Sequence, residues 1–371
     1  MLPERAYWLA WAKIPNIGAI LLKRIQQHFG SLAVAWQADA TEFMAIEGFG
    51  AKLMVKIAQT RPKIQPEQLL KQYEAIDYWT PGDDNYPNLL KEIPSMPITL
   101  FYRGQIPAEN RGSKPAIGIV GTRYPTTYGK RWTKKISAAL AQKGFTIVSG
   151  MAAGIDTQAH QGCLEVGGKT IAVLGTGIDV VYPRSNKNLY QQIIQTGGLI
   201  LSEYAPGTPP SRNNFPARNR IIAGLCRAIL VMEAPQRSGA LITARFANEF
   251  GRDVYVLPGS LDNQQAQGCL GLLNQGAQVI LSQEHLLDML GEIPQLDIPI
   301  SQQSSQVLQK DLPALSTELK QVYSLISPEP IPYDLIIARS NLNPTTIAAH
   351  LLQLELMGLI TQLPGMRYQK L

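Results

Sequence analysis

The sequence is poor in cysteine and histidine and has no long hydrophobic run. Its 371 residues include only three cysteines and four histidines, and Cys163, Cys226 and Cys269 lie far apart without a Cys-x-x-Cys pair. This pattern argues against a cysteine-rich metal site and predicts reduced thiols in the core of a cytoplasmic protein. No stretch approaches the roughly 20 apolar residues that a membrane span needs. The start, from Met1 to Arg5, lacks the features of a cleavable signal, so we expect neither export nor membrane insertion.

Charged residues are also scarce. They make up 17% of the chain against 45% hydrophobic residues, which is typical of a globular protein with a sizeable core. The formal net charge is +6 at pH 7, and this weakly favours a polyanionic partner. The length predicts two or three domains, since one domain usually has roughly 100–200 residues.

Complete nucleotide-binding motifs are absent as well. Residues 162–170 superficially resemble a phosphate-binding P-loop, but the first glycine is displaced by one position and the segment precedes a strand instead of following one. The segment Gly175-Thr176-Gly177 has Val180 where a dinucleotide motif needs its third glycine. No cluster of His, Cys, Asp or Glu has the spacing of a metal site. We therefore expect no cofactor.

One pair of side chains could serve catalysis. Asp156 and His160 are four residues apart, so on a helix they share one face, as an acid–base pair or two metal ligands would. The alternative is that Asp156 orients the start of the helix and His160 makes a hydrogen bond within the core. The sequence favours this structural role, because no further ligand or nucleophile lies nearby.

Residues 1–70 are predicted to form a helical domain that contains a repeat. The segments Ile14-Pro15-Asn16-Ile17-Gly18 and Ile46-Glu47-Gly48-Phe49-Gly50 each precede a helical pattern. This arrangement resembles the helix-hairpin-helix, in which backbone N–H groups of the hairpin can bind DNA phosphates. The alternative is a small helical bundle whose glycines only let the helices turn, and the first hairpin carries no basic residue.

Residues 71–292 are predicted to form an α/β domain. After an irregular, proline-containing lead-in, short apolar segments of buried-strand type alternate with helix-length amphipathic segments. Such alternation predicts an extended Rossmann-like fold with a doubly wound, mostly parallel sheet. The predicted strands are residues 116–120, 146–148, 170–174, 198–201, 228–232, 253–257 and 278–280.

The C-terminal part is predicted to be a linker followed by a winged helix. Residues 293–313 are rich in Gln, Ser and Pro and have no periodicity, so we interpret them as the linker. Residues 314–371 read as three helices and a strand pair, with a helix at 331–338 and another starting at Pro344 after the cap Asn343. The helix from Pro344 to Met357 has no Lys or Arg. We therefore expect it not to read a DNA major groove.

Turns rich in glycine, hydroxyl and basic residues follow several of the predicted strands. In an open parallel sheet, ligands bind outside the carboxyl ends of the strands. Glycines there let the backbone approach an anion, and N–H groups at the following helix N-termini can bind it. One such turn means little, but turn geometry does not explain the arginines on or near five of them: Arg123, Arg184, Arg218, Arg220 and Arg237.

Residues 212–220 combine three arginines, three asparagines and Phe215. We predict a basic loop in which Arg binds phosphates, Asn bonds to bases or sugars, and Phe215 stacks on a base. A solvated surface loop is the alternative. Together with the turns at the strand ends, the segment predicts a groove for a single nucleic-acid strand.

Several motifs in order through the α/β domain resemble the DNA-processing protein A family, DprA, also called Smf. The flanking helical and winged-helix modules also resemble additions that are common in that family. The motifs are Gly-Thr-Arg (121–123), Ser-Gly-x-Ala-x-Gly-Ile-Asp-x-x-Ala-His (149–160), Gly-x-Asp-x-x-Tyr-Pro (177–183), Phe-Pro-x-Arg-Asn-Arg-x-Ile (215–222), Ser-Gly-Ala-x-x-Thr-Ala (238–244) and Leu-Pro-Gly (257–259).

The resemblance implies a non-enzymatic protein of natural transformation. Such a protein binds and shields incoming single-stranded DNA, loads the RecA recombinase onto it and acts as a homodimer, here through the Rossmann-like domain. Arg123 and Arg184 would be DNA contacts, while Arg218 or Arg220 could instead brace the loop through Glu203 or Glu233. The candidate DNA-binding residues are Arg123, Lys130, Ser149, Gly150, Gly154, Arg184, Asn186, Phe215, Arg218, Asn219, Arg220, Ser238 and Gly239.

Two other classes of function compete with this interpretation. LOG-like phosphoribohydrolases, which cleave nucleoside monophosphates on a related fold, carry Pro-Gly-Gly-x-Gly-Thr-x-x-Glu. Residues 236–244 stand at the comparable place without Pro-Gly-Gly or the following Glu, so the obvious catalytic carboxylate is missing. A sequence-specific regulator that uses its winged helix is the third class.

Overall fold

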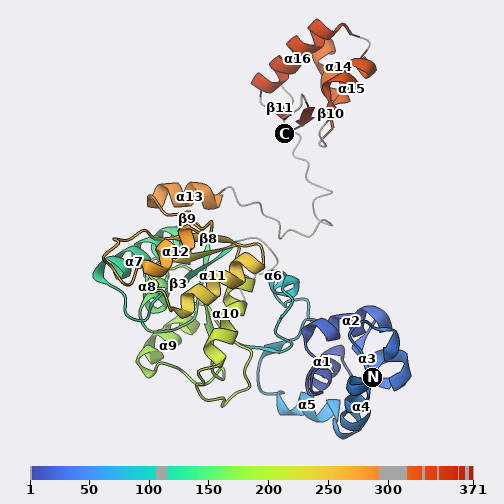
Figure 1. The fold of residues 1–371 in the computed structure, drawn as a ribbon, viewed down its shortest axis with the longest axis vertical. Helices are drawn as coiled ribbons and strands as arrows, with labels where there is room; N and C mark the ends of the chain where they lie inside the picture. The colour runs from blue at the N-terminus through green and yellow to red at the C-terminus, as the bar shows by residue number, and fades with distance from the viewer. Residues whose placement is uncertain are drawn as a thin grey trace. The chain divides into compact units, whose positions relative to one another are not determined.

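The computed structural model describes residues 2–105, 115–291, 316–327, 331–340, 342–357, 359–363 and 367–370. The chain divides into two compact units, Met1–Pro299 and Ile300–Leu371 (Figure 1). The predicted linker, residues 293–313, lies outside the described residues. The finer division of the first unit at residue 70 stays a prediction.

The first unit begins with short helices packed around large aromatic side chains. Trp8, Trp11 and Phe43 are almost completely buried there. The guanidinium of Arg24 donates to the carbonyl of Glu47 (2.7 Å) and pairs with its carboxylate (3.1 Å), which joins the helix after the first predicted hairpin to the second hairpin. The helices are α1 (Glu4–Ala12), α2 (Ala19–Phe29), α3 (Leu32–Gln37), η1 (Ala40–Ala45), α4 (Ala51–Thr60), η2 (Arg61–Lys63) and α5 (Pro66–Gln72).

A nine-stranded sheet forms the centre of the first unit, in the order β1-β2-β6-β5-β4-β3-β7-β8-β9. All neighbouring strands from β6 to β9 in this order run parallel. The chain first winds outward from β3 through β4, β5 and β6, and then restarts on the other side of β3 with β7. The strands are β1 (Tyr78–Trp79), β2 (Leu100–Gly104), β3 (Ala116–Val120), β4 (Thr146–Ser149), β5 (Thr170–Leu174), β6 (Leu199–Ser202), β7 (Ala228–Val231), β8 (Asp253–Val256) and β9 (Gln278–Val279).

Helices cover both faces of this sheet (Figure 1). Ile117 and Ile119 of β3 pack in a cluster with residues of α7 and α8, while Val120 belongs to a cluster with residues of α10 and α11. Alternation along each strand thus produces the predicted doubly wound α/β fold. The helices are α6 (Asn88–Glu92), α7 (Thr127–Gln142), α8 (Ile155–Glu165), η3 (Arg184–Asn186), α9 (Lys187–Gln195), α10 (Asn214–Leu225), α11 (Gly239–Glu249), α12 (Gln267–Leu273) and α13 (Gln283–Gly291).

Two strands lie in the proline-containing lead-in, which is predicted to be irregular. β2 pairs antiparallel with β6, with Phe101 opposite Ser202, and β1 adds to the outer side of β2. The rings of Trp79 and Tyr102 stack at 4.3 Å between centroids. The sheet is therefore mixed at this edge, and its outermost strand is only two residues long.

The second unit is a small helical domain with a three-stranded sheet in the order β10-β12-β11. Ile347, Leu351 and Leu354 on its last helix are buried in the core. Ile331 and Pro332 form a strand instead of starting the helix expected at 331–338. Pairing of Ile331 with Tyr368 explains this difference. The elements are α14 (Thr317–Leu325), β10 (Ile331–Pro332), α15 (Tyr333–Ser340), α16 (Pro344–Leu356), β11 (Ile360–Leu363) and β12 (Arg367–Lys370).

None of the helices in the described part of the chain is both long and apolar enough to cross a membrane.

Candidate nucleic-acid interface

The carboxyl ends of β3, β4, β5 and β6 meet at one edge of the sheet, because these strands are parallel neighbours. The strand order changes direction between β3 and β7, which is the position where open α/β sheets form a ligand crevice. Most of the predicted site residues lie in turns or helix starts that follow these strands. We name this edge the strand-end surface.

A cation and two aromatic rings lie together on the strand-end surface. The guanidinium carbon of the exposed Arg123 lies 5.5 Å from the centroid of the Phe215 ring. The ring of Tyr182, which is 40% exposed, lies 5.4 Å from Phe215 at an interplanar angle of 34°. Gly175 lets Phe215 approach, since a Cβ there would be 2.7 Å from the ring atom Cδ1. The turn after β3 and the start of α10 thus supply one charge and a stacking surface.

The arginine–asparagine segment is a helix start, and not the basic loop that its composition predicts. α10 begins at Asn214 and includes Phe215, Arg218 and Arg220. Pro216 does not prevent this, because the N–H groups of the first turn have no intrahelical partner and a proline there removes no hydrogen bond. Positions 218 and 220 consequently point in different directions from the helix axis.

Arg218 is buried and uses its guanidinium to bind backbone carbonyl groups. It is 4% exposed, and its Nη1 donates to the carbonyl oxygens of Gly150 (2.7 Å) and Val173. Its Nε donates to Oδ1 of Asn219 at 3.2 Å. Burial lowers the pKa of Arg218 to about 10, against an opposing effect of the Asp156 carboxylate, so the group stays charged at neutral pH. Arg218 thus connects the end of β4 to the end of β5. This arrangement does not support a direct contact between Arg218 and DNA.

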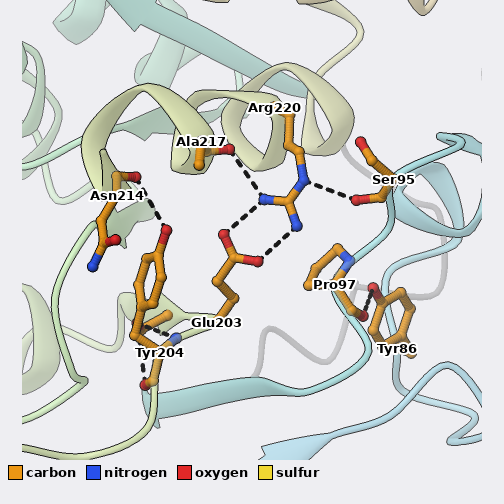
Figure 2. Close-up of polar contacts among 9 residues, drawn as sticks. Tyr86, Ser95, Pro97, Glu203, Tyr204, Asn214, Ala217 and Arg220 are labelled. Atoms are coloured by element: carbon orange, nitrogen blue, oxygen red, sulfur yellow. Dashed lines mark hydrogen bonds and ion pairs between the residues drawn. The ribbon is translucent and has the colours of Figure 1, made fainter. Parts of the chain in front are cut away.

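Arg220 is also committed to protein groups (Figure 2). Its Nη1 and Nη2 bind the two carboxylate oxygens of Glu203 at 2.7 and 2.6 Å, and its Nε donates to the carbonyl of Ser95 at 2.9 Å. Both side chains of the ion pair are less than 20% exposed. Arg220 thus joins α10 to the end of β6 and to the lead-in before β2. Of the two carboxylates considered from the sequence, Glu203 and not Glu233 is its partner.

Tyr204 reinforces this network, although no motif in the sequence singles it out. Its hydroxyl donates to the carbonyl of Asn214 at 3.2 Å, at the first residue of α10 (Figure 2). Burial first, and the nearby Glu203 second, raise the pKa of Tyr204 to about 12, so the hydroxyl keeps its proton at any physiological pH. This hydrogen bond therefore fixes the first residue of α10, next to Phe215, to the turn after β6.

The turn after β4 has an unusual backbone that several side chains hold in place. Met151 has φ 59° and Gly154 has φ 86°, both in the left-handed region. The buried Asp156 carboxylate accepts from the N–H groups of Gly150 (3.1 Å) and Ala152 (3.3 Å). Asn186 donates from Nδ2 to the carbonyl of Met151 at 2.9 Å. A non-glycine residue with positive φ is uncommon and costs free energy, and such residues cluster at functional sites.

Gly154 is required in this turn by its contacts as well as by its backbone angle. A Cβ there would be 2.5 Å from the carbonyl oxygen of Thr122 and 2.6 Å from that of Arg123. The turn after β4 therefore fits against the turn that carries Arg123. Ser149 lies beneath it, fully buried, with its hydroxyl donating to the carbonyl of Ile119 at 2.6 Å.

The remaining predicted residues divide into exposed and supporting positions. Lys130, Arg184 and Gly239 are exposed. Asn219 is buried and donates from Nδ2 to the carbonyl of Gly239 at 3.1 Å. Ser238 caps α11, with its hydroxyl accepting from the N–H of Ala240.

Asp156 and His160 have the structural roles that the sequence favours. Thr170 donates its hydroxyl proton to the carbonyl of Ile147 (2.8 Å), so it accepts from Nδ1 of His160 (2.7 Å). His160 is fully buried, and burial lowers its pKa to about 3. The same loss of solvation raises the pKa of Asp156, against the opposing effect of Arg218. Among the described residues there is no group of three or more His, Cys, Asp or Glu side chains placed to hold a metal ion.

Comparison with known families assigns both units. Residues 77–291 match the family model of DNA recombination-mediator protein A. Residues 307–366 match the DprA winged helix domain. The protein Smf of Synechocystis sp. is 50% identical, with 99% of each chain covered. The DNA processing protein DprA of Streptococcus pneumoniae is 44% identical over 61% of this chain and 78% of that protein.

Solved structures agree with this assignment. The X-ray structure of DNA processing protein A from Streptococcus pneumoniae matches with a TM-score of 0.66 at 36% identity, covering 78% of this chain and 98% of that one. The protein from Helicobacter pylori, solved for its single-stranded DNA binding mode, matches with a TM-score of 0.52 at 32% identity, covering 58% and 96%. The fold, the order of the motifs and these relatives lead to one conclusion: the chain belongs to the DNA-processing protein A family, DprA or Smf.

Proposed function

We propose that this protein binds single-stranded DNA on the strand-end surface. The observation that carries the proposal is the exposed Arg123 beside the rings of Phe215 and Tyr182. A guanidinium neutralises a backbone phosphate, and an aromatic ring stacks on a base whatever its identity. A single strand offers both groups at once, whereas a duplex buries its base faces. The single-strand binding mode described for the Helicobacter pylori relative supports the same ligand.

We assign the predicted residues to four kinds of role. Arg123, Lys130 and Arg184 are exposed and supply positive charge to phosphates. Arg218 and Arg220 are positioning residues, because their guanidiniums already bind protein groups. Phe215 supplies the stacking surface. The remaining predicted residues hold or form the backbone turns at which the strand binds: Ser149, Gly150, Gly154, Asn186, Asn219, Ser238 and Gly239.

Membership of the family supports a wider role. We propose that the protein acts in natural transformation, where it protects incoming single-stranded DNA and loads RecA onto it, as a cytoplasmic homodimer without catalytic activity. The Streptococcus pneumoniae relative is named as a DNA processing protein, and neither this name nor that of the Synechocystis protein Smf contains a reaction. A direct test follows RecA nucleation on single-stranded DNA in the presence of a single-strand binding protein. We expect the protein to accelerate nucleation, and equal rates with and without it would exclude the loading role.

The binding proposal is tested with oligonucleotides across a salt series. We expect tighter binding to single strands than to a duplex of the same length, with affinity falling as salt rises. Arg123→Ala and Arg184→Ala should each weaken binding to every sequence alike and reduce the salt slope by about 0.7. Their melting temperatures should stay close to wild type, because exposed side chains support little core. Lys71→Ala, which removes an exposed lysine of α5, is the matched control.

The stacking role is tested separately with Phe215→Ala. We expect a loss of roughly 1–3 kcal/mol in binding free energy, with the salt slope unchanged, because a ring carries no counterion. Phe215→Trp keeps a stacking surface and should retain most of the affinity. Wild-type affinity in a double variant of Arg123→Ala and Arg184→Ala would overturn the assignment of the surface.

A further inference from the structure

A buried carboxylate occupies a position at which related folds bind phosphate. Glu233 is the second residue after β7, next to the change of strand order beside β3. Its side chain is 2% exposed. The two oxygens accept from the N–H of Thr126 (2.8 Å) and from the hydroxyl of the same residue (2.6 Å). Thr126 is the N-cap of α7, so the carboxylate lies at the N-terminus of a 16-residue helix.

Neighbouring residues leave space for this carboxylate and hold its backbone in place. Gly129, in the first turn of α7, has no side chain where a Cβ would collide with Oε2 of Glu233. The backbone N–H of Thr122 donates to the carbonyl of Glu233 at 2.7 Å, which fixes the residue against the end of β3. In the described part of the chain, no Lys or Arg forms an ion pair with Glu233. The N-terminus of α7 and Thr126 therefore provide the compensation that a buried charge requires.

In open α/β sheets, the start of the helix after the first strand commonly binds phosphate. The N–H groups at the start of the helix after the first strand bind the phosphate of a nucleotide at the change of strand order. Here the first parallel strand is β3, the helix is α7, and the position holds a carboxylate of the protein itself. A phosphate and the Glu233 carboxylate, both anions, would compete for the same N–H group and the same space.

We propose that Glu233 is a specificity-determining residue that excludes the phosphate groups of free nucleotides from the start of α7. The exposed arginines of the strand-end surface stay available to the phosphates of a polymer. The sheet thus keeps the architecture of a nucleotide-binding fold while one side chain closes its phosphate position. The inference concerns small phosphates and stands apart from the proposed DNA binding.

The experiment uses the full chain and pyrophosphate or AMP as probes, by calorimetric titration at constant ionic strength. Glu233→Ala removes the carboxylate and opens its space, so we expect it to bind pyrophosphate on the order of tenfold more tightly than wild type. The matched control is Glu249→Ala, which removes a half-exposed carboxylate from α11 and changes the net charge equally. A folded Glu233→Ala variant that binds no better than Glu249→Ala would overturn the proposal.

A second measurement needs only the wild-type protein and covers the case in which Glu233→Ala does not fold. Crystals of the wild type soaked in pyrophosphate should show no anion within hydrogen-bond distance of the Thr126 N–H. An anion bound there, with Glu233 displaced, would overturn the proposal whatever the variant does. Neither result depends on DNA affinity, so a failure here is distinguishable from a failure of the proposed function.

Discussion

Arg218 and Arg220 lie two positions apart on α10 and belong to the same sequence motif, but their surroundings differ. Arg218 is enclosed and binds carbonyl groups, whereas Arg220 forms a bidentate ion pair with Glu203. A bidentate guanidinium–carboxylate pair with little exposure is costly to break, because one charge is left without a partner. We therefore expect substitution of either residue to lower the stability of the fold more than it weakens the direct contacts with DNA.

We predict that Arg220→Ala lowers the free energy of unfolding by about 2 kcal/mol. The salt slope of single-strand binding should not change, because this guanidinium contacts protein and not phosphate. Chemical denaturation and a salt series on the same preparation measure the two quantities. Arg245→Ala breaks an exposed pair with Glu249 on α11 and, as control, should cost less than about 1 kcal/mol. A salt slope flattened by one contact in Arg220→Ala would instead place this residue on the DNA.

His160 makes the stability of the first unit depend on pH. Its folded pKa of about 3 lies below its ordinary value of 6.5 because burial disfavours the charged ring. The stabilisation from keeping it neutral is therefore complete above pH 6.5 and is lost as the pH falls toward 3. Between pH 6.5 and pH 3 the unfolded state binds one more proton than the folded state. The free energy of unfolding therefore falls by about 1 kcal/mol for each pH unit.

Denaturation of wild type and His160→Gln between pH 7 and pH 4 measures this effect. We expect the variant to be less stable at pH 7 but to lose stability less steeply as the pH falls. His28→Gln changes an exposed histidine and is the matched control. Parallel curves for wild type and His160→Gln would show that His160 does not titrate as inferred.

At the scale of elements, α16 combines a buried apolar stripe with a lack of Lys and Arg. Ile347, Leu351 and Leu354 form core, and the helix has no Lys or Arg to meet a DNA phosphate. We predict that deleting residues 313–371 leaves single-strand affinity within about threefold, since the charges invoked for binding lie in the other unit. Binding titrations on the truncated protein, with its circular dichroism recorded, make the test. A loss of about a hundredfold by a folded truncation would assign the winged helix a direct role in binding.

The sequence predicts elements well where one physical signal dominates. The strand at Ala116–Val120 is found as predicted, because a short apolar run between turns fits a buried parallel strand. The sequence does not predict β1, because two residues carry no periodicity, or β2, because its last residues are exposed. It predicts a loop at α10, because Pro216 and the polar residues around it resemble a turn, although a first helical turn tolerates both.

For the candidate site, the position of each residue in the fold could be predicted from the sequence, but its burial and hydrogen-bond partners could not. Clustering of Arg123, Phe215 and Arg218 near the strand ends follows from the parallel sheet alone. The burial of Arg218 does not, because its partners are backbone carbonyls of Gly150 and Val173, which every residue possesses. Glu233 is named from the sequence only as a possible partner of an arginine. Its hydrogen bonds with Thr126 could not be predicted, because they join residues 107 positions apart.

At the scale of the whole molecule, the remaining prediction is self-association. α12 buries Cys269 and Leu272 against its own sheet, while Leu270 is only partly covered. We expect a homodimer mass at micromolar concentration in analytical ultracentrifugation, and Leu270→Glu should shift the mass toward the monomer if α12 contributes to the contact. A monomeric mass for the wild type at that concentration would contradict the proposed dimer.

All three cysteines are free and buried. Burial raises the pKa values of Cys163 and Cys269 to about 12 and raises that of Cys226 as well, so almost no thiolate is present at neutral pH. A maleimide dye should therefore react with a cysteine introduced by Tyr124→Cys, a position that is 82% exposed beside Arg123, and leave the native thiols unmodified. The unaltered chain is thus a suitable background for single-site fluorescent labelling, and a dye next to Arg123 would report the arrival of a DNA strand in real time.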